Sequence, residues 1–259
     1  PTLYYQCSNH AGMGGQANTN STFGSSNFSG SVQTTVSAGS TQGFSIVSYT
    51  GTGSVGTFGH GLNSKPNLMI QKKLNGSTAW TVYHDKVASD PATDYLYLSS
   101  DAAVADYAGH YNDTEPTSSV FTLGTDTSIN GSGTPNITYC FHEVKGYSKF
   151  GSYTGTGSTS SNFIYTGFKP SFVMTKRTNG SAAWQIIDTA RNPINPTTHA
   201  LFPNDSTSEL GTYTTDYLSN GFNIRVTTAS RNGSGDTYIY MAFAESPFVN
   251  SNGVPTNAR

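Results

Sequence analysis

The sequence predicts an all-β protein with two tandem, related β-sandwich domains of the jelly-roll type. Charged residues are only 11% of the chain, against about 25% in an average globular protein. Ser, Thr, Asn and Gly therefore supply most of the surface polarity, and these residues favour turns and strand faces over helix interiors. Aromatic residues reach 12%, enough to build a core, and no segment shows the 3.6-residue periodicity of an amphipathic helix.

An internal repeat gives the domain organisation. The segment SYTGTGS at Ser48–Ser54 recurs without change at Ser152–Ser158, an offset of 104 residues (152 − 48). The same offset carries a second block onto its copy, and a third block recurs at an offset of 102: Lys65–Trp80 onto Lys169–Trp184, and Asn130–Glu143 onto Asn232–Glu245. Three collinear blocks with nearly one offset indicate a tandem duplication.

Short runs rich in Val, Ile, Tyr, Phe and Leu, bounded by turn residues, are typical of strands. We expect strands at Asn67–Lys72, Trp80–His84, Tyr95–Leu98, Val120–Leu123, Ile137–Glu143, Ser171–Lys176, Phe222–Thr227 and Tyr238–Glu245. The NGSG before the last strand of each repeat predicts a hairpin turn, because Asn-Gly accepts the positive φ of a type I′ turn. One helical turn is expected within Asp101–Ala108.

These patterns give five segments. Residues 1–16 are expected to be the end of a separate domain, residues 17–43 a Gly/Ser/Thr-rich linker, and residues 249–259 a tail. Between linker and tail, residues 44–150 and 151–248 are the two predicted sandwich repeats. A single jelly roll made from both repeats is the alternative. Because the chain begins at Pro1 without Met, we expect it to be a processed or truncated piece of a longer protein.

The N-terminal segment LYYQCSNHAGMG carries a metal-ligand spacing. Cys7, His10 and Met13 follow an aromatic stretch as C-x-x-H-x-x-M, and this resembles the last ligand loop of a cupredoxin. The resemblance implies a copper site of Cys, two His and a weak axial Met. The second His would lie far upstream, and only six residues precede Cys7. We therefore expect no cofactor in this chain, and copper only if upstream residues complete the site.

The body of the chain carries a wider resemblance. The segments FSIVSYTGTGS, KPNLMIQKK, YCFHEVKGYSKFGSYTGTGS and NGSGDTYIYMAFAESPF resemble repeated C-terminal modules of marine and cyanobacterial phage structural proteins. The resemblance implies a virion-surface location, in a tail fibre, spike or capsid decoration, and a part in host attachment. It also implies partners: other virion proteins, a host-surface glycan or protein, and further copies of the chain, with a homotrimer preferred.

Few residues are candidates for chemistry. Trp80 and Trp184 occupy equivalent repeat positions and could stack on a sugar, although a Trp on an alternating strand is more often a core anchor. No catalytic motif of the common hydrolase, metalloprotease or nucleotide-binding types is present. Glu143 and Glu245 match across the repeats, and we expect each to pair with a nearby Lys or Arg. The sequence thus predicts no enzyme.

Composition excludes two further classes. The formal net charge is −2 without a basic run, so binding of nucleic acid through its phosphates is not expected. No apolar segment approaches the roughly 18 residues that cross a bilayer, so membrane insertion is not expected either. Two alternatives to a virion protein remain: a secreted carbohydrate-binding module, and a polysaccharide depolymerase.

Overall fold

The computed structural model describes residues 2–6, 14–18, 24–160, 162–247 and 249, and it confirms the all-β prediction. The chain divides into two compact units. Unit 1 holds Pro1–Thr78 and Ala108–His142, and unit 2 holds Ala79–Tyr107 and Glu143–Arg259. Residues 79–107, which belong to the first repeat by sequence, are thus part of unit 2.

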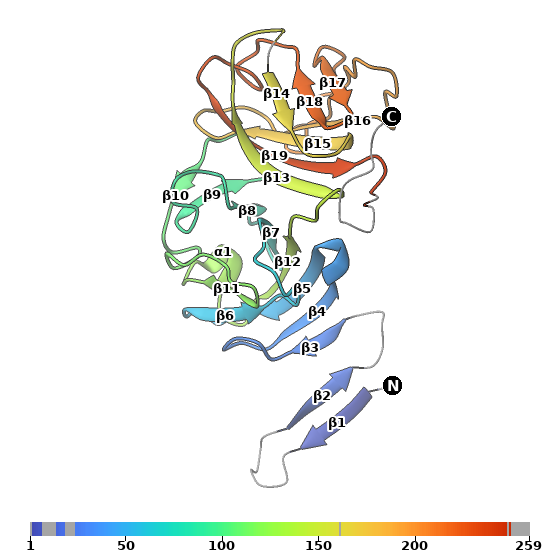
Figure 1. Ribbon diagram of the computed structural model, residues 1–259. Coiled ribbons are helices and arrows are strands. Elements are labelled where there is room, and N and C mark those ends of the chain that lie inside the picture. The colour runs from blue at the N-terminus through green and yellow to red at the C-terminus, as the bar shows by residue number, and fades with distance from the viewer. Residues whose placement is uncertain (1, 7–13, 19–23, 161, 248, 250–259) are drawn as a thin grey trace. The chain divides into compact units, whose positions relative to one another are not determined.

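Unit 1 contains two antiparallel sheets that face each other (Figure 1). Five strands lie in the order β7-β12-β5-β4-β3, with bounds Leu68–Lys73, Pro135–Phe141, Phe44–Thr50, Thr34–Gly39 and Ser25–Asn27. A second sheet pairs β11 (Val120–Leu123) with β6 (Gly56–Gly59). The unit also has a hairpin of β1 (Thr2–Gln6) and β2 (Gly14–Asn18), the 3-10 helix η1 (Ser40–Gln42) and the helix α1 (Thr127–Asn130).

Aromatic rings join the two sheets of unit 1. Tyr49 of β5 lies 4.7 Å from Phe58 of β6, measured between ring centroids. Phe58 in turn stacks on Phe121 of β11 at 5.6 Å. All three side chains are buried, so the apolar positions of these alternating strands form the core that the sequence predicts.

Unit 2 is also a sandwich. One sheet has the order β13-β19-β15-β16, with bounds Ser148–Thr154, Thr237–Ala244, Pro170–Arg177 and Gln185–Asp188. The other has the order β14-β18-β17, with bounds Asn162–Tyr165, Gly221–Ile224 and Thr215–Leu218. The segment 79–107 adds β8 (Thr81–His84), β9 (Asp94–Tyr97) and β10 (Ala105–Asp106), which pair in sequence order.

The core of unit 2 lies between its two sheets. Val173, Tyr240 and Ala242 come from the four-stranded sheet, and Ile164 and Phe222 come from the three-stranded sheet. Six of the eight residues of β19 are buried, because this strand has a neighbour on each side and is covered on both faces. Its near-continuous apolar sequence, YIYMAFA, reflects that position.

The duplicated sequences form equivalent strands. In unit 1, β12 pairs with β5 on one side and β7 on the other. In unit 2, β19 pairs with β13 and β15 in the same way. The second sheets correspond too, since β6–β11 and β14–β18 place one pair of core residues opposite each other: Phe58 opposite Phe121, and Ile164 opposite Phe222.

A buried asparagine holds the same loop in both repeats. The Asn130 side chain accepts from the Thr52 backbone N–H (2.9 Å) and donates to the carbonyls of Ser54 (2.8 Å) and Gly124 (2.6 Å). Asn232 accepts from Thr156 N–H and donates to two carbonyls in the same arrangement, those of Ser158 and Val226. The repeated TGTGS and NGSG sequences therefore serve the scaffold, because each buried backbone group needs a partner.

Three further sequence predictions differ from the structure. Residues 17–43 are not a plain linker, because β3 and β4 lie there and β4 pairs with β5. Within Asp101–Ala108 there is no helical turn, and β10 occupies part of the segment. The NGSG segments are not hairpin turns, since the strands before and after them belong to different sheets. Gly133 and Gly235 take positive φ there instead, at 69° and 77°.

Candidate functional site: a polar groove in unit 2

A groove of about 560 Å³ opens on unit 2 where the ends of several strands meet. Most of its surface is apolar and comes from aliphatic and tyrosine side chains, while its polar groups are hydroxyls, the Asn179 amide and the Lys86 ammonium group. The lining residues are Lys86, Val87, Ala88, Val104, Ser152, Tyr153, Thr154, Thr178, Asn179, Thr237 and Tyr238. This volume lies within the range of small-molecule binding sites, roughly 300–1,000 Å³.

Strand register brings the lining residues together. Tyr153 and Thr154 end β13, and they lie opposite Tyr238 and Thr237 at the start of β19. Thr178 follows β15 and accepts a backbone hydrogen bond at its carbonyl from Val104 N–H (2.9 Å). The Tyr153 and Tyr238 rings are stacked, with centroids 4.8 Å apart and planes 9° apart. Four chain segments thus meet at one end of the sheet.

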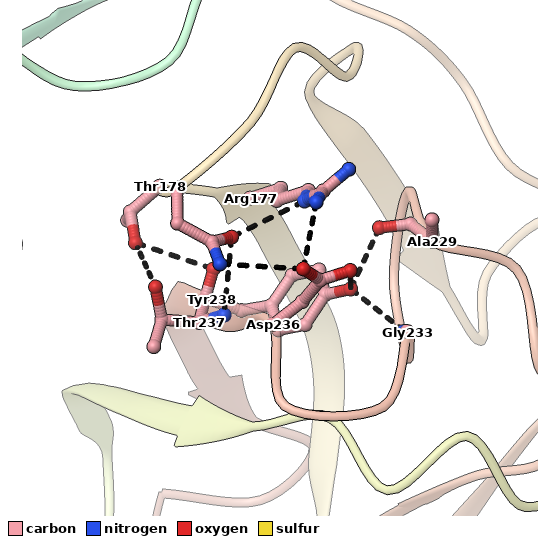
Figure 2. A network of polar contacts seen from close by, with 8 residues as sticks. Arg177, Thr178, Ala229, Gly233, Asp236, Thr237 and Tyr238 are labelled. Carbon is pink, nitrogen blue, oxygen red and sulfur yellow. Dashed lines mark hydrogen bonds and ion pairs between the residues drawn. The ribbon is translucent and has the colours of Figure 1, made fainter.

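A hydrogen-bond network fixes the polar side chains beside the groove (Figure 2). Arg177 Nη2 donates to Asp236 Oδ1 at 2.6 Å, and Asn179 Nδ2 donates to the same oxygen at 3.2 Å. Asn179 Oδ1 accepts from Arg177 Nε and from the Thr237 backbone N–H, at 3.2 and 3.3 Å. The Asn179 amide is therefore oriented before any ligand arrives.

Two further contacts complete the network. The hydroxyls of Thr178 and Thr237 lie 2.6 Å apart. The Tyr238 hydroxyl donates to the Ala229 carbonyl at 2.6 Å and accepts from Gly233 N–H at 2.8 Å. Burial raises the pKa of Tyr238 to about 12, partly offset by the Gly233 hydrogen bond, so the phenol stays neutral at physiological pH. The network therefore presents fixed hydrogen-bonding groups, and the opposite charges of its ion pair, Arg177 and Asp236, compensate each other.

The N-terminal metal motif cannot be placed. Cys7, His10 and Met13 lie outside the described residues. Within the described part of the chain, no group of three or more His, Cys, Asp or Glu side chains is arranged to hold a metal ion. The other cysteine, Cys140, is free and buried, and burial raises its pKa to about 12. The expectation that this chain binds no copper unless upstream residues complete the site therefore stays a prediction.

The two tryptophans differ in their surroundings. Trp184 is buried, with an exposed fraction of 2%, and its indole Nε1–H donates to the Tyr97 carbonyl at 2.9 Å. It directly precedes β16 and is a core anchor of unit 2. Trp80 is half-buried, and its backbone N–H donates to the Ser99 hydroxyl.

The carboxylates predicted to be structural are paired. Glu143 binds Lys149 at 3.1 Å, and Glu245 binds Lys169 at 3.0 Å. These ion pairs confirm the expectation for both glutamates. Neither lies in the groove described above.

A buried histidine also has a structural role. His84 Nδ1 accepts from Lys86 N–H at 3.0 Å, and its Nε2 donates to the Tyr240 carbonyl at 3.3 Å. Burial lowers the pKa of His84 to about 4, despite the neighbouring Asp85 carboxylate. The ring is therefore neutral at physiological pH and uses both nitrogens inside unit 2.

Two buried cations belong to the scaffold of unit 2. Lys176 donates to the carbonyls of Asp101 (3.0 Å) and Ala182 (2.9 Å), and burial lowers its pKa to about 8. Arg231 is fully buried and donates to Thr215 Oγ1 at 2.7 Å, while its Nε and Nη2 have no hydrogen-bond partner among the residues that the structure describes. The equivalent position of the first repeat is Ile129, whose carbonyl accepts from a tyrosine hydroxyl as that of Arg231 does.

Sequence reasoning missed the groove residues. Thr178 and Asn179 lie within the repeated block Lys169–Trp184, which by itself indicates only the duplication. Ser, Thr and Asn are abundant everywhere in this chain, so their presence at one place is no signal by itself. Only the fold brings Val104 and Thr237 to the same groove.

One comparison with known proteins gives a match. The sequence matches the family described as domain of unknown function DUF7483 over residues 16–247, most of the chain. The chain belongs to the DUF7483 family. The DUF7483 match begins within β2 and runs through β3 and β4, so this segment is part of the family domain, whereas Cys7, His10 and Met13 lie outside the matched residues. No curated protein and no solved structure matches the chain.

Within the described residues, no helix has the length and apolar character needed to cross a membrane.

Proposed function

We propose that this protein is a non-catalytic attachment protein of a virion surface, and that the groove of unit 2 binds a neutral glycan. The observation that carries the proposal is the lining of the groove, which combines hydroxyl and amide groups with a larger apolar surface. Its charged lining residue, Lys86, is paired with Asp85 at 3.4 Å. Neutral sugars present hydroxyls along their edges and C–H groups on their faces. A lining of this composition complements both.

The polar network supports binding to neutral partners in particular. Asp236 is already paired with Arg177 and accepts from Asn179. The charges of Asp236 and Arg177 therefore compensate each other and do not require a charged group in the ligand. Asn179 and the threonine pair are held by protein contacts before binding. Such preorganisation lowers the conformational cost of binding.

The same pairing favours binding over chemistry. Hydrolysis of a glycoside uses two carboxyl groups that flank the scissile bond. Asp236, which directly precedes the lining residue Thr237, accepts from a guanidinium and an amide, and Tyr238 has a raised pKa. These groups suit fixed recognition better than proton transfer at neutral pH.

The virion location rests on the sequence resemblance to phage structural modules. Several copies on one particle would raise the avidity of a weak single site by about 10²–10⁴. The proposed assembly is therefore a homo-oligomer that is attached to other virion proteins and directed at a host-surface glycan.

A glycan array with two matched variants tests the binding proposal. Thr154→Arg places a long cationic side chain in the groove, while Thr50→Arg makes the same change at the exposed, repeat-equivalent position of unit 1. We expect neutral oligosaccharides to bind the wild-type chain and Thr50→Arg equally, and Thr154→Arg at least about tenfold more weakly. Equal loss in both variants, or no glycan bound by the wild type, would refute the groove.

A secreted carbohydrate-binding module is the second candidate, because the groove lining supports it equally. Location separates the two. Immunogold labelling of purified particles is expected to mark the virion surface, and unlabelled particles would favour the secreted module. Release of reducing ends from a bound polysaccharide would instead indicate a depolymerase.

A further inference from the structure

The outer edge of β14 differs from its counterpart in the first repeat. In unit 1 the segment Asn27–Val32 runs beside β6, where Val32 N–H donates to the Thr57 carbonyl at 3.0 Å. Ser31 Oγ accepts from Thr57 N–H at 2.9 Å. Gly59 permits this close approach, since a Cβ there would lie 2.3 Å from Asn27 Oδ1. The first repeat thus covers its own edge strand.

The second repeat replaces both outward residues of this strand by aromatic ones. Strand register equates Thr57 with Phe163 and Gly59 with Tyr165, because core residues Phe58 and Ile164 align between them. Phe163 is 46% exposed and Tyr165 is 62% exposed. A side chain at the Gly59 position excludes a segment like Asn27–Val32, so this edge is built for a different neighbour.

The edge of β14 is open among the described residues. β14 is a terminal strand that pairs only with β18, and Figure 1 shows it at the border of the three-stranded sheet. Thr166 N–H, one residue beyond β14, donates to Asn220 on the β18 side. Backbone groups alternate along a strand, so those of Phe163 and Tyr165 point away from β18.

Apart from its short length of four residues, β14 has none of the usual protection against pairing within the described part of the chain. Natural edge strands carry Lys, Pro or bulges that prevent contact with another strand. The sequence of β14 is Asn-Phe-Ile-Tyr, without charge, Pro or Gly. Leu218 lies on the same face of the sheet as Tyr165, because both residues pair with Gly221. Its side chain adds exposed apolar surface to this face.

From these observations we propose that β14 pairs antiparallel with β14 of a second copy of this chain. In the register that uses both outward residues, Phe163 of each copy lies opposite Tyr165 of the other, with Ile164 on the two-fold axis. Each copy then offers the same surface to the other, as a two-fold interface requires. Two aromatic cross-strand pairs and the shared backbone hydrogen bonds hold the dimer.

Charge substitution at the edge tests this surface. We expect the wild-type chain to sediment as a dimer at micromolar concentration. The doubly substituted chains Phe163→Lys/Tyr165→Lys and Phe163→Glu/Tyr165→Glu should each be monomeric, with dissociation constants raised at least about tenfold by like charges opposite each other. Their 1:1 mixture should dimerise again, because Lys of one chain then faces Glu of the other.

The control is Val55→Lys/Leu74→Lys, which places two lysines at exposed apolar positions of unit 1 and should leave the dimer intact. Circular dichroism checks that all variants are folded. A wild-type chain that is still monomeric at about 100 μM, where a dissociation constant would be too weak for a specific complex, would overturn the proposal. So would an oligomer, a trimer included, that both charged variants leave unchanged, or charged variants that stay monomeric when mixed.

Discussion

The clearest test of the scaffold is removal of the Asn232 side chain. Asn232 is fully buried, and its amide satisfies the Thr156 N–H and the carbonyls of Ser158 and Val226 at 2.7–2.9 Å. Asn232→Ala leaves these three backbone groups without their partner, and it also removes the bond from Asn162 Nδ2, which keeps its bond to the Thr154 carbonyl. At about 1 kcal/mol for each of the three backbone groups, we expect the free energy of unfolding to fall by about 3 kcal/mol.

Urea unfolding followed by circular dichroism measures this loss. A decrease of about 3 kcal/mol corresponds to a fall in Tm of about 6–12 °C for a unit of this size. Asn130→Ala removes the equivalent contacts in unit 1 and should cost a similar amount. Asn75→Ala, at an exposed turn position, is the matched control and should change stability by less than about 0.5 kcal/mol. A loss below about 1 kcal/mol in both buried variants would refute the argument.

Three further predictions concern unit 2. Burial lowers the folded-state pKa of His84 from 6.5 to about 4, so the unfolded chain binds more protons than the folded chain between these pH values. The free energy of unfolding should therefore fall by up to about 3 kcal/mol as the pH drops from 6.5 to 4. A urea midpoint that depends on pH as strongly in His84→Gln as in the wild type would contradict this. Arg231→Ile copies the first repeat and removes a buried cation whose Nε and Nη2 lack hydrogen-bond partners among the described residues. Urea unfolding should therefore show that the free energy of unfolding rises by about 1 kcal/mol or more. A fall of more than about 2 kcal/mol would show that the guanidinium stabilises the unit. Trp184 is buried and Trp80 is only half-buried. The emission maximum of Trp80→Phe, in which Trp184 remains, should therefore lie at a shorter wavelength than that of Trp184→Phe. The opposite order would contradict the structure.

The sequence predicted strands well where burial alternates strictly. β12 alternates along Asn136–Phe141, with the side chains at every second position buried, and its predicted range was nearly correct. The duplicated blocks predicted equivalent strands because identical residues such as Tyr49 and Tyr153 make identical contacts, each donating to the carbonyl just before a buried Asn.

The failures arose where local sequence does not determine the partner. β3 and β4 consist of Ser, Thr, Asn, Ala, Gly and one Val, so only their pairing with β5 makes them strands. In the NGSG segments, the buried side chains of Asn130 and Asn232 accept hydrogen bonds from loops that are distant in sequence. Rules for turns that use only neighbouring residues do not predict such contacts. The assignment of residues 79–107 to unit 2 depends on long-range packing in the same way.

The candidate site was invisible for a related reason. Its groups are common residues from five separate segments, and the network of Arg177, Asn179 and Asp236 forms only when β15 and β19 lie side by side. The exposed Phe163 and Tyr165 became informative only when register aligned them with Thr57 and Gly59.

The most direct test of the central claim is to map where a bound neutral oligosaccharide lies. Amide hydrogen exchange of the full chain, with and without an oligosaccharide selected on the array, compares the groove segments with their repeat-equivalents. We predict slower exchange at Ser152–Thr154, Thr178 and Thr237 when the sugar is bound, and no change at Ser48–Thr50. Protection confined to other segments, or equal protection of both repeats, would contradict the assignment of the groove as the glycan site.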